Sequence, residues 1–247
     1  MNTIGIVNNL DRLRIRKLLI IGLSASVITG IGDFLLGYAD ETTGISPASA
    51  LLSSAVNLGD AQLITGSLLG MFGIFLEGLS FFAVYRLMAV EAPCYAHIYR
   101  AGFFGYIWLA PVGCHLNIGI MNIAYKYVVQ ADPVMAEHAA KLMIYGFSIP
   151  VYVLLICFWL PVIIIQYKAF AEGKTPYPRY AKWFNLITGA VPALIIAALI
   201  GPHTAIGAGI GTMFLSFGNA LMFGGLLAVM PSQEQFDRFA ESLQTGE

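Results

Sequence analysis

Three side chains that can exchange protons lie inside long apolar stretches of the sequence: Asp33, Glu77 and His115. An ionisable group at the centre of a membrane span costs about 2.5 to 3.5 kcal/mol on insertion scales, so such groups are rare and commonly functional. In a dry pocket, a carboxyl group or an imidazole can be tuned to exchange protons near neutral pH. The residue types therefore predict general acid–base catalysis, with Asp33, Glu77 and His115 as the candidate catalytic residues.

Polar and aromatic side chains within the same stretches are the candidates for binding a substrate. They are Trp108, Asn117, Asn122, Tyr145, Ser216 and Asn219. Such residues can also serve only as hydrogen bonds between helices, each of which contributes about 0.6 kcal/mol on average. The two buried carboxylates have the same structural alternative, as acceptors that hold a neighbouring helix. Both interpretations stay open at the level of the sequence.

Helical spacing predicts where these side chains point, because positions three, four or seven residues apart share one face of an α-helix. Three faces follow: Ser26, Gly30 and Asp33; Gly66, Gly70, Gly73 and Glu77; and Trp108, Pro111, His115 and Asn122. Glycine stripes are typical of helices that pack closely in a membrane. We therefore expect the polar groups to face the interior of a helical bundle and to line one shared cavity.

Several cofactors and partners are disfavoured by the same residues. Haem requires two axial ligands at matched depth, whereas only His115 is deep and the other three histidines lie in or beside connections. Asp33, Glu77 and His115 are legitimate zinc ligands, but they lack a spaced ligand motif. No lysine lies within a span for a retinal Schiff base, and the net charge of −1 disfavours a nucleic-acid partner. We expect neither a metal nor a cofactor.

The elements that position these groups are predicted to be membrane-spanning helices. Apolar residues form 58% of the chain and charged residues only 11%, with a mean hydropathy of +0.76, whereas soluble domains carry about 25% charged residues. A span needs about 20 apolar residues. Six stretches qualify: about 18–39, 61–87, 101–125, 142–167, 183–200 and 205–230. The fold class is therefore an all-α, polytopic membrane bundle, in a single membrane domain over 1–247.

Two features of these predicted spans depend on particular residues: the break between the last two and the retention of the first. Gly201-Pro202-His203 is expected to separate the last two spans, because proline and glycine interrupt helices. Gly37-Tyr38-Ala39 offers a small-residue site at which the first stretch could be cleaved as a signal. That stretch is long enough to span, so we expect it to be retained.

Basic residues predict the orientation of the spans. Of the 13 Lys and Arg residues, 11 lie on one side of the predicted spans, and only Lys126 and Lys141 lie on the other. Basic residues favour the cytoplasmic side. Both termini are therefore predicted to be cytoplasmic, which agrees with an even number of spans.

Two segments outside the spans have their own pattern. Residues 40–60 form an outer loop with an apolar patch at Ala50-Leu51-Leu52, which we expect to lie on the membrane or to cap the bundle. In the tail, 231–247, Ser232 and Gln235 have the spacing of a capping box. Phe236, Phe239 and Leu243 then recur with helical spacing, which predicts a short amphipathic cytoplasmic helix.

One short segment resembles a known family. Gly32-Asp33-Phe34-Leu35-Leu36 is similar to the Gly-Asp-x-Leu-Leu stretch of the bacterial lysoplasmalogenase membrane hydrolases. The resemblance implies an intramembrane aspartate that acts on ether lipids. Nearest to the second aspartate motif of that family, this chain has Ser216-Phe217-Gly218-Asn219, and that family has more spans. The mixture of intramembrane Asp, Glu, His and Asn is also similar in kind to sterol isomerases with the emopamil-binding fold, without a shared motif.

We predict an integral-membrane enzyme that isomerises, cyclises or hydrolyses a lipidic or otherwise apolar small molecule. Glu77 or Asp33 would exchange the proton with His115 as its partner, and Asn117 or Asn219 would orient the substrate. A proton-coupled transporter or channel for a small solute is the alternative, and a non-catalytic membrane sensor or assembly factor is the third. Membrane lipids and an apolar ligand are the expected partners, a homo-oligomer stays open, and the expected location is a bacterial-type plasma membrane.

Overall fold

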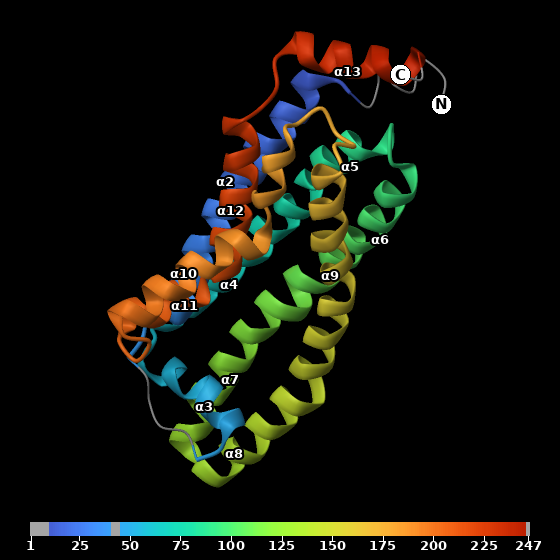
Figure 1. Cartoon of the computed structure of the whole chain (residues 1–247). Helices are drawn as coiled ribbons and strands as arrows, with labels where there is room; N and C mark the ends of the chain where they lie inside the picture. The colour runs from blue at the N-terminus through green and yellow to red at the C-terminus, as the bar shows by residue number, and fades with distance from the viewer. Residues whose placement is uncertain (1–9, 41–44, 246–247) are drawn as a thin grey trace.

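The computed structural model describes residues 10–40 and 45–245, and every regular element within these ranges is a helix (Figure 1). The α-helices are α2 (Arg12–Gly37), α3 (Pro47–Ser53), α4 (Asp60–Ser80), α5 (Phe82–Ala89), α6 (Pro93–Leu109), α7 (Asn117–Ala131), α8 (Pro133–Lys141), α9 (Ile149–Ala171), α10 (Leu186–Ile200), α11 (Ala205–Thr212), α12 (Phe214–Ala228) and α13 (Gln233–Thr245). Two π-helical segments join them, Ala110–Leu116 (η2) and Leu142–Ser148 (η3). Two short 3₁₀ turns are Ser54–Asn57 (η1) and Arg179–Trp183 (η4). The prediction of an all-α chain is confirmed for the described residues.

Four continuous helices are long and apolar enough to cross a membrane. They are Arg12–Gly37, Asp60–Ala89, Pro93–Ala131 and Pro133–Ala171. A fifth is present if α11 and α12, which meet at an angle of 54°, together form one broken span. The third and fourth helices have 39 residues each and extend at both ends beyond the predicted stretches 101–125 and 142–167.

The predicted fifth stretch, 183–200, begins later and is shorter than expected. Helix α10 has 15 residues, fewer than the roughly 17 usually needed for a span. Its start is set by Asn185, whose side-chain oxygen accepts hydrogen bonds from the backbone N–H groups of Ile187 and Thr188. The helix ends at Gly201, which has a positive φ of 107°, and α11 starts at Ala205. The two helices therefore separate at the Gly201-Pro202-His203 segment.

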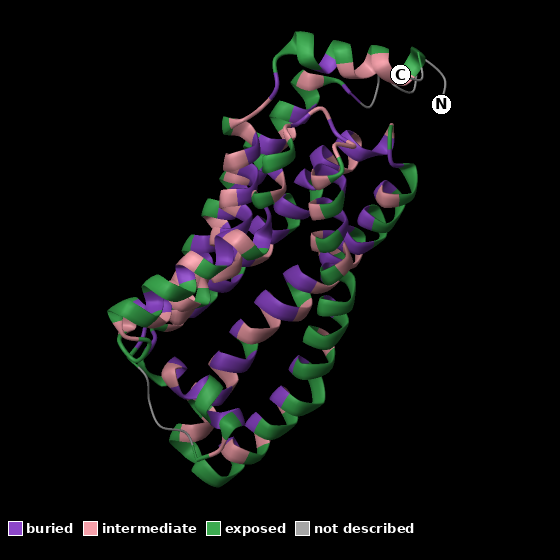
Figure 2. Ribbon diagram, viewed as in Figure 1, coloured by how far each residue is buried: buried purple, intermediate pink, exposed green. Residues whose placement is uncertain are grey.

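The helices form a tight bundle at one end and diverge at the other. Helices α2, α4, α10, α11 and α12 run together on one side of Figure 1, and α7, α8 and α9 form the other side. Buried residues gather where the two sides join near α13, and most of α8 and the adjoining part of α9 is exposed (Figure 2). The joined end is filled by aromatic side chains, including Phe81, Tyr99, Phe103, Phe170 and Phe223.

Glycines allow α2 and α4 to approach closely, in the most extensive helix contact of the molecule. A Cβ atom at Gly32 would lie 2.6 Å from the backbone nitrogen of Gly70 and 2.7 Å from the backbone oxygen of Gly66. No larger residue fits between these backbones. Gly66, Gly70 and Gly73 are buried together with Glu77, which confirms the predicted glycine stripe as a packing surface.

The two peripheral segments cover opposite ends of the molecule. Helix α3 packs its Ala48 and Leu52 against Met121 and Tyr125 of α7 and against α8, so it caps the diverging end. Helix α13 lies across the tight end beside the start of α2 (Figure 1), with Phe236 1% exposed. The capping box at Ser232 and Gln235 is present, with both reciprocal hydrogen bonds formed.

Candidate functional site

Asp33 and His115 form a close pair between α2 and η2. The Nε2 atom of His115 lies 2.6 Å from Oδ1 of Asp33, and their side chains are only 10% and 13% exposed. The hydroxyl of Ser216 donates to the other carboxylate oxygen of Asp33. Thr212 donates its hydroxyl to the backbone carbonyl of Asp33 at 2.8 Å. We call Asp33, His115 and Ser216 the Asp33 group.

Two breaks in helical regularity bring this group together. His115 lies in the π-helical segment η2, and π turns inside helices are frequent at functional sites. Pro111 in this segment has no backbone N–H, so it cannot complete the regular α-helical hydrogen bonds. The bend of 54° between α11 and α12 places Thr212 and Ser216 on either side of the break and against α2.

The imidazole of His115 rests directly on α4 at Gly70. A Cβ atom at Gly70 would overlap the imidazole ring, including its Nδ1 atom. This Nδ1 atom is buried and has no hydrogen-bond partner among the described residues. The ring is therefore held from one side by the carboxylate of Asp33 and from the other by a position that only glycine can occupy.

A second polar group lies around Glu77, which is 0% exposed. The hydroxyl of Tyr106 donates to Oε2 of Glu77 at 2.8 Å, and the side-chain amide of Asn219 donates to the same oxygen at 2.9 Å. The other oxygen of Glu77 and the carbonyl oxygen of Asn219 have no partner among the described residues. We call Glu77, Tyr106 and Asn219 the Glu77 group; it joins α4 to α6 and α12.

Two cavities meet at the Asp33 group. The deep chamber has a volume of about 420 Å³ and is lined by residues such as Ile74, Leu155, Trp159 and Leu215. The vestibule has a volume of about 740 Å³ and reaches toward α3 and α10, with Leu36, Ser54, Asn122 and Leu194 among its lining residues. Both volumes fall in the range of about 300 to 1,000 Å³ that is usual for ligand pockets.

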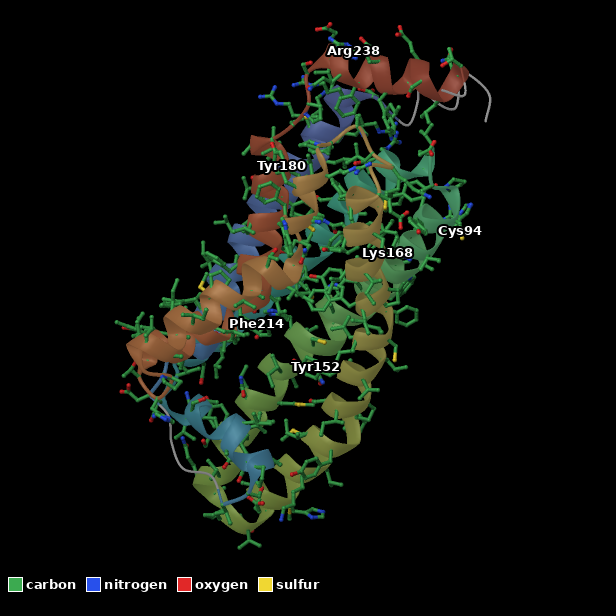
Figure 3. All side chains as sticks on the ribbon, viewed as in Figure 1. Cys94, Tyr152, Lys168, Tyr180, Phe214 and Arg238 are labelled. Carbon is green, nitrogen blue, oxygen red and sulfur yellow. The ribbon has the colours of Figure 1, made fainter. Side chains whose placement is uncertain are left out.

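The junction of the two cavities is defined by the residues that line both. They are Asp33, Cys114, His115, Tyr152, Thr212 and Phe214. Figure 3 labels two of them, Tyr152 on α9 and Phe214 at the start of α12, which come to the junction from the two sides of the molecule. The carboxylate and the imidazole therefore border the space in which a ligand can lie.

One wall of the deep chamber is aromatic. The ring of Tyr106 stacks on that of Trp159, with centroids 5.5 Å apart and an interplanar angle of 14°. Behind it, Phe81 meets Tyr106 edge-on at 5.6 Å and also contacts Phe223. Glu77 does not line either cavity, whereas its partners Tyr106 and Asn219 line the deep chamber. The Glu77 group is thus part of the wall that closes the chamber.

Comparison with known protein families places residues 1–233 in one family, described as a family of unknown function (DUF6796). The chain belongs to this family. No curated protein and no solved structure matches it. The assignment of a function to this family member therefore depends on the two cavities and on the groups that border them.

The other predicted binding residues differ in where they lie. Ser216 and Asn219 line the deep chamber, and Asn122, which is 7% exposed, lines the vestibule. Asn117 is half-buried and lines neither cavity. Chamber and vestibule thus hold three of the predicted binding residues, from two helices, α12 and α7.

Trp108 and Tyr145, two of the predicted binding residues, lie away from both cavities. Trp108 is 80% exposed and Tyr145 is 49% exposed, and neither lines the chamber or the vestibule. The π-helical segment η2 lies between Trp108 and Asn122, and Tyr145 lies within η3. A π turn takes more residues than an α turn, so it rotates the helix face that α-helical spacing predicts.

Three cavity residues escaped the prediction from sequence: Tyr106, Cys114 and Tyr152. A tyrosine in a membrane protein is expected at the membrane boundary, where its ring and hydroxyl meet different surroundings. Tyr152 instead lies well inside the predicted stretch 142–167, and this displacement from the boundary is the signal that could have identified it. Cys114 offers no comparable signal beyond its place next to His115.

Metal ligation has little support within the described part of the chain. Asp33 and His115 are a ligand pair, but no group of three or more His, Cys, Asp or Glu side chains converges there. Structural and catalytic zinc sites use at least three protein ligands. The Asp33 group is therefore better suited to holding and transferring a proton than to holding a metal ion.

Proposed function

We propose that this protein is an integral-membrane enzyme that acts on a lipidic or apolar small molecule by acid–base chemistry. The observation that carries the proposal is the position of the Asp33–His115 pair, at the junction of the deep chamber and the vestibule. Asp33 donates or accepts the proton, and His115 and Ser216 orient its carboxylate. Isomerisation, cyclisation and hydrolysis all contain such a step, to which a positioned acid or base contributes about 10² to 10⁴ in rate.

Glu77 is assigned a supporting role in this scheme. Its carboxylate does not border either cavity, and the two hydrogen bonds that it accepts hold Tyr106 and Asn219 in the chamber wall. The proton transfer is therefore assigned to Asp33 alone. Tyr152 and Cys114, at the junction, are in position to contact the reacting part of the substrate.

The proposed topology has six spans with both termini in the cytoplasm of a bacterial-type cell. It adds the short helix α10 and the broken pair of α11 and α12 to the four long helices. The start of α2 and helix α13 lie at the same end of the molecule (Figure 1), as an even number of spans requires. The distribution of basic residues, 11 of 13 on that side of the predicted spans, supports the orientation.

Topology can be tested with reporters at the two ends of the chain. We expect a reporter fused to either terminus to be active in the cytoplasm, and a cysteine placed at Ala50 to be labelled from outside intact cells. A C-terminal reporter that is active outside would show that the number of spans is odd.

One observation favours a proton-coupled transporter as the second candidate. The break between α11 and α12 lies beside Asp33, and broken helices near the middle of the bilayer are typical of transporter binding sites. Transport needs a path toward both faces of the membrane. The stacked rings of Tyr106 and Trp159 form part of the wall of the deep chamber, and we keep the enzyme as the first candidate.

The two candidates are separated by comparing wild type with Asp33→Asn. The purified proteins are incubated with a total lipid extract in lipid nanodiscs, and the lipids are compared by mass spectrometry. We expect wild type, but not Asp33→Asn, to deplete one lipid and to accumulate a product. Glu77→Gln is the matched control, since it makes the same carboxylate-to-amide change away from the cavities.

The transporter is tested with the same proteins in sealed proteoliposomes. Uptake of a polar solute that requires a proton gradient and is lost in Asp33→Asn, without any lipid conversion in the nanodisc experiment, would replace the enzyme by the transporter. If wild type neither converts a lipid nor takes up a solute, the non-catalytic sensor replaces both candidates.

A further inference from the structure

Several polar side chains of the deep chamber already bond within the protein. Tyr106 and Asn219 bond to Glu77, Ser216 bonds to Asp33, and the hydroxyl of Thr29 donates to the backbone oxygen of Ala25. The surface that remains for a ligand is made by side chains such as Ile74, Leu155, Ile156 and Leu215. The chamber therefore suits an apolar group, which gains free energy in proportion to the area that it buries.

The vestibule has a different character and lies on the other side of the Asp33–His115 pair. Besides that pair, its lining includes the hydroxyl-bearing Ser54 and Thr212 and the amide of Asn122. Convergent polar groups in a pocket fix the orientation of a ligand that carries hydrogen-bonding groups. A polar group is favoured there and disfavoured in the deep chamber, where it would lose its hydrogen bonds to water.

We infer that the ligand of this site is a single-chain amphiphile whose apolar chain fills the deep chamber and whose polar head lies in the vestibule. This orientation places the bond between head and chain at the junction, beside Asp33 and His115. The inference rests on the proposed function and names its substrate class. Tyr106 and Trp159 stack in one wall of the chamber. We expect this wall to limit the length of the bound chain, so that one chain length fits best and longer chains bind less well.

Leu155 offers a matched pair of variants that change the chamber in opposite directions. Its side chain is 6% exposed, lines the deep chamber and does not line the vestibule. Leu155→Ala enlarges the chamber, and Leu155→Phe reduces it. Asn122→Leu changes the vestibule only. Trp108→Ala, at a position outside both cavities, is the control.

The experiment measures the rise in Tm that monoacylglycerols of increasing chain length produce in the full-length protein in nanodiscs, because a bound ligand stabilises the folded state. Wild type and Trp108→Ala should show a maximum at the same chain length. Leu155→Ala should move the maximum to longer chains by about three carbon atoms, the number that the substitution removes. Leu155→Phe should move it to shorter chains. Asn122→Leu should alter the preference between headgroups at fixed chain length without moving the maximum.

A rise in Tm that grows steadily with chain length in wild type, or a maximum that Leu155→Ala leaves in place, would overturn the inference. If Leu155→Phe does not fold, the wild-type maximum and the shift in Leu155→Ala still decide it. This readout requires no turnover. If the maximum moves in a protein that converts no lipid, the amphiphile site is supported and the proposed enzyme is contradicted. If lipid is converted but binding does not depend on chain length, the enzyme is supported and the amphiphile site is contradicted.

Discussion

The Asp33 group and the Glu77 group are built alike but differ in access. Each has a carboxylate that contacts two polar side chains of other helical segments. His115 pairs with Asp33 and Ser216 donates to it, and Tyr106 and Asn219 donate to Glu77. The side chain of Asp33 is 13% exposed and borders both cavities. Glu77 is 0% exposed and borders neither.

The comparison teaches that hydrogen bonding alone does not identify the reactive carboxylate. A buried carboxylate needs donors whatever its role, because an unpaired polar group in an apolar interior costs about 1 to 3 kcal/mol. What a proton transfer needs in addition is a position within hydrogen-bond reach of a bound substrate. Asp33 has such a position, whereas Glu77 is separated from the chamber by its own partners.

The largest expected effect is on turnover in Asp33→Asn. An amide cannot donate and recover a proton as a carboxyl group does, so the rate of lipid conversion should fall by about 10² to 10⁴. The variant should still fold, since the amide oxygen can accept the hydrogen bond that Ser216 donates to the carboxylate. The measurement is conversion and Tm on the same purified sample.

Glu77→Gln sharpens this test as the matched substitution in the other group. Its amide oxygen can still accept from Tyr106 and Asn219, so turnover should stay within a few-fold of wild type. Equal losses in Asp33→Asn and Glu77→Gln would contradict the distinction between the two groups and would make Glu77 part of the proton path.

The next effect in size is on stability, in Glu77→Leu. Leucine offers no acceptor, so the hydroxyl of Tyr106 and the amide of Asn219 lose their partner, at about 1 to 3 kcal/mol for each donor. The free energy of unfolding should therefore fall, while turnover per folded molecule changes little. Turnover that is abolished in protein with an unchanged Tm would show that Glu77 acts in the chemistry.

A smaller effect is expected when the support behind His115 is changed. Gly70→Ala introduces a methyl group where the imidazole lies, and overpacking a well-filled site costs about 1 to 3 kcal/mol. The ring must then shift from its position beside Asp33, so turnover falls together with stability. Gly224→Ala is the control, because its Cβ would lie 3.5 Å from the nearest atom, on Leu23, in ordinary contact. If the two alanines behave alike, the position of His115 does not depend on Gly70.

The sequence predicts much of what brings the carboxylates into the interior. Burial of Asp33, Glu77 and His115 follows from the cost of exposing them to lipid, and the glycine stripe before Glu77 follows from helical spacing. Both are local properties of one helix. They do not depend on how the helices are arranged, so they can be read before the structure is known.

The difference in access between Asp33 and Glu77 has no such local origin. The cavities exist because α9 and η2 diverge from α10 and α11, and Tyr152 and Phe214 meet across that space only in three dimensions. The bend at Met213, between α11 and α12, also occurs without a proline, so the sequence does not predict it. Pro161 and Pro192, by contrast, lie inside continuous helices. Proline positions alone therefore predict the breaks poorly.

The smallest expected effect tests the rotation of the helix face by η2. By α-helical spacing Trp108 shares a face with His115, whereas in the structure its side chain is 80% exposed on the outside of the bundle. Trp108→Ala should therefore leave turnover at the wild-type level and change the free energy of unfolding by no more than about 0.5 kcal/mol, as exposed substitutions usually do. Turnover and Tm are measured beside Asp33→Asn. A loss in Trp108→Ala comparable to that in Asp33→Asn would mean that Trp108 faces the substrate and that the helix continues in α-helical register through Ala110–Leu116. The Asp33 group would then need a different geometry, since His115 reaches Asp33 from within that segment.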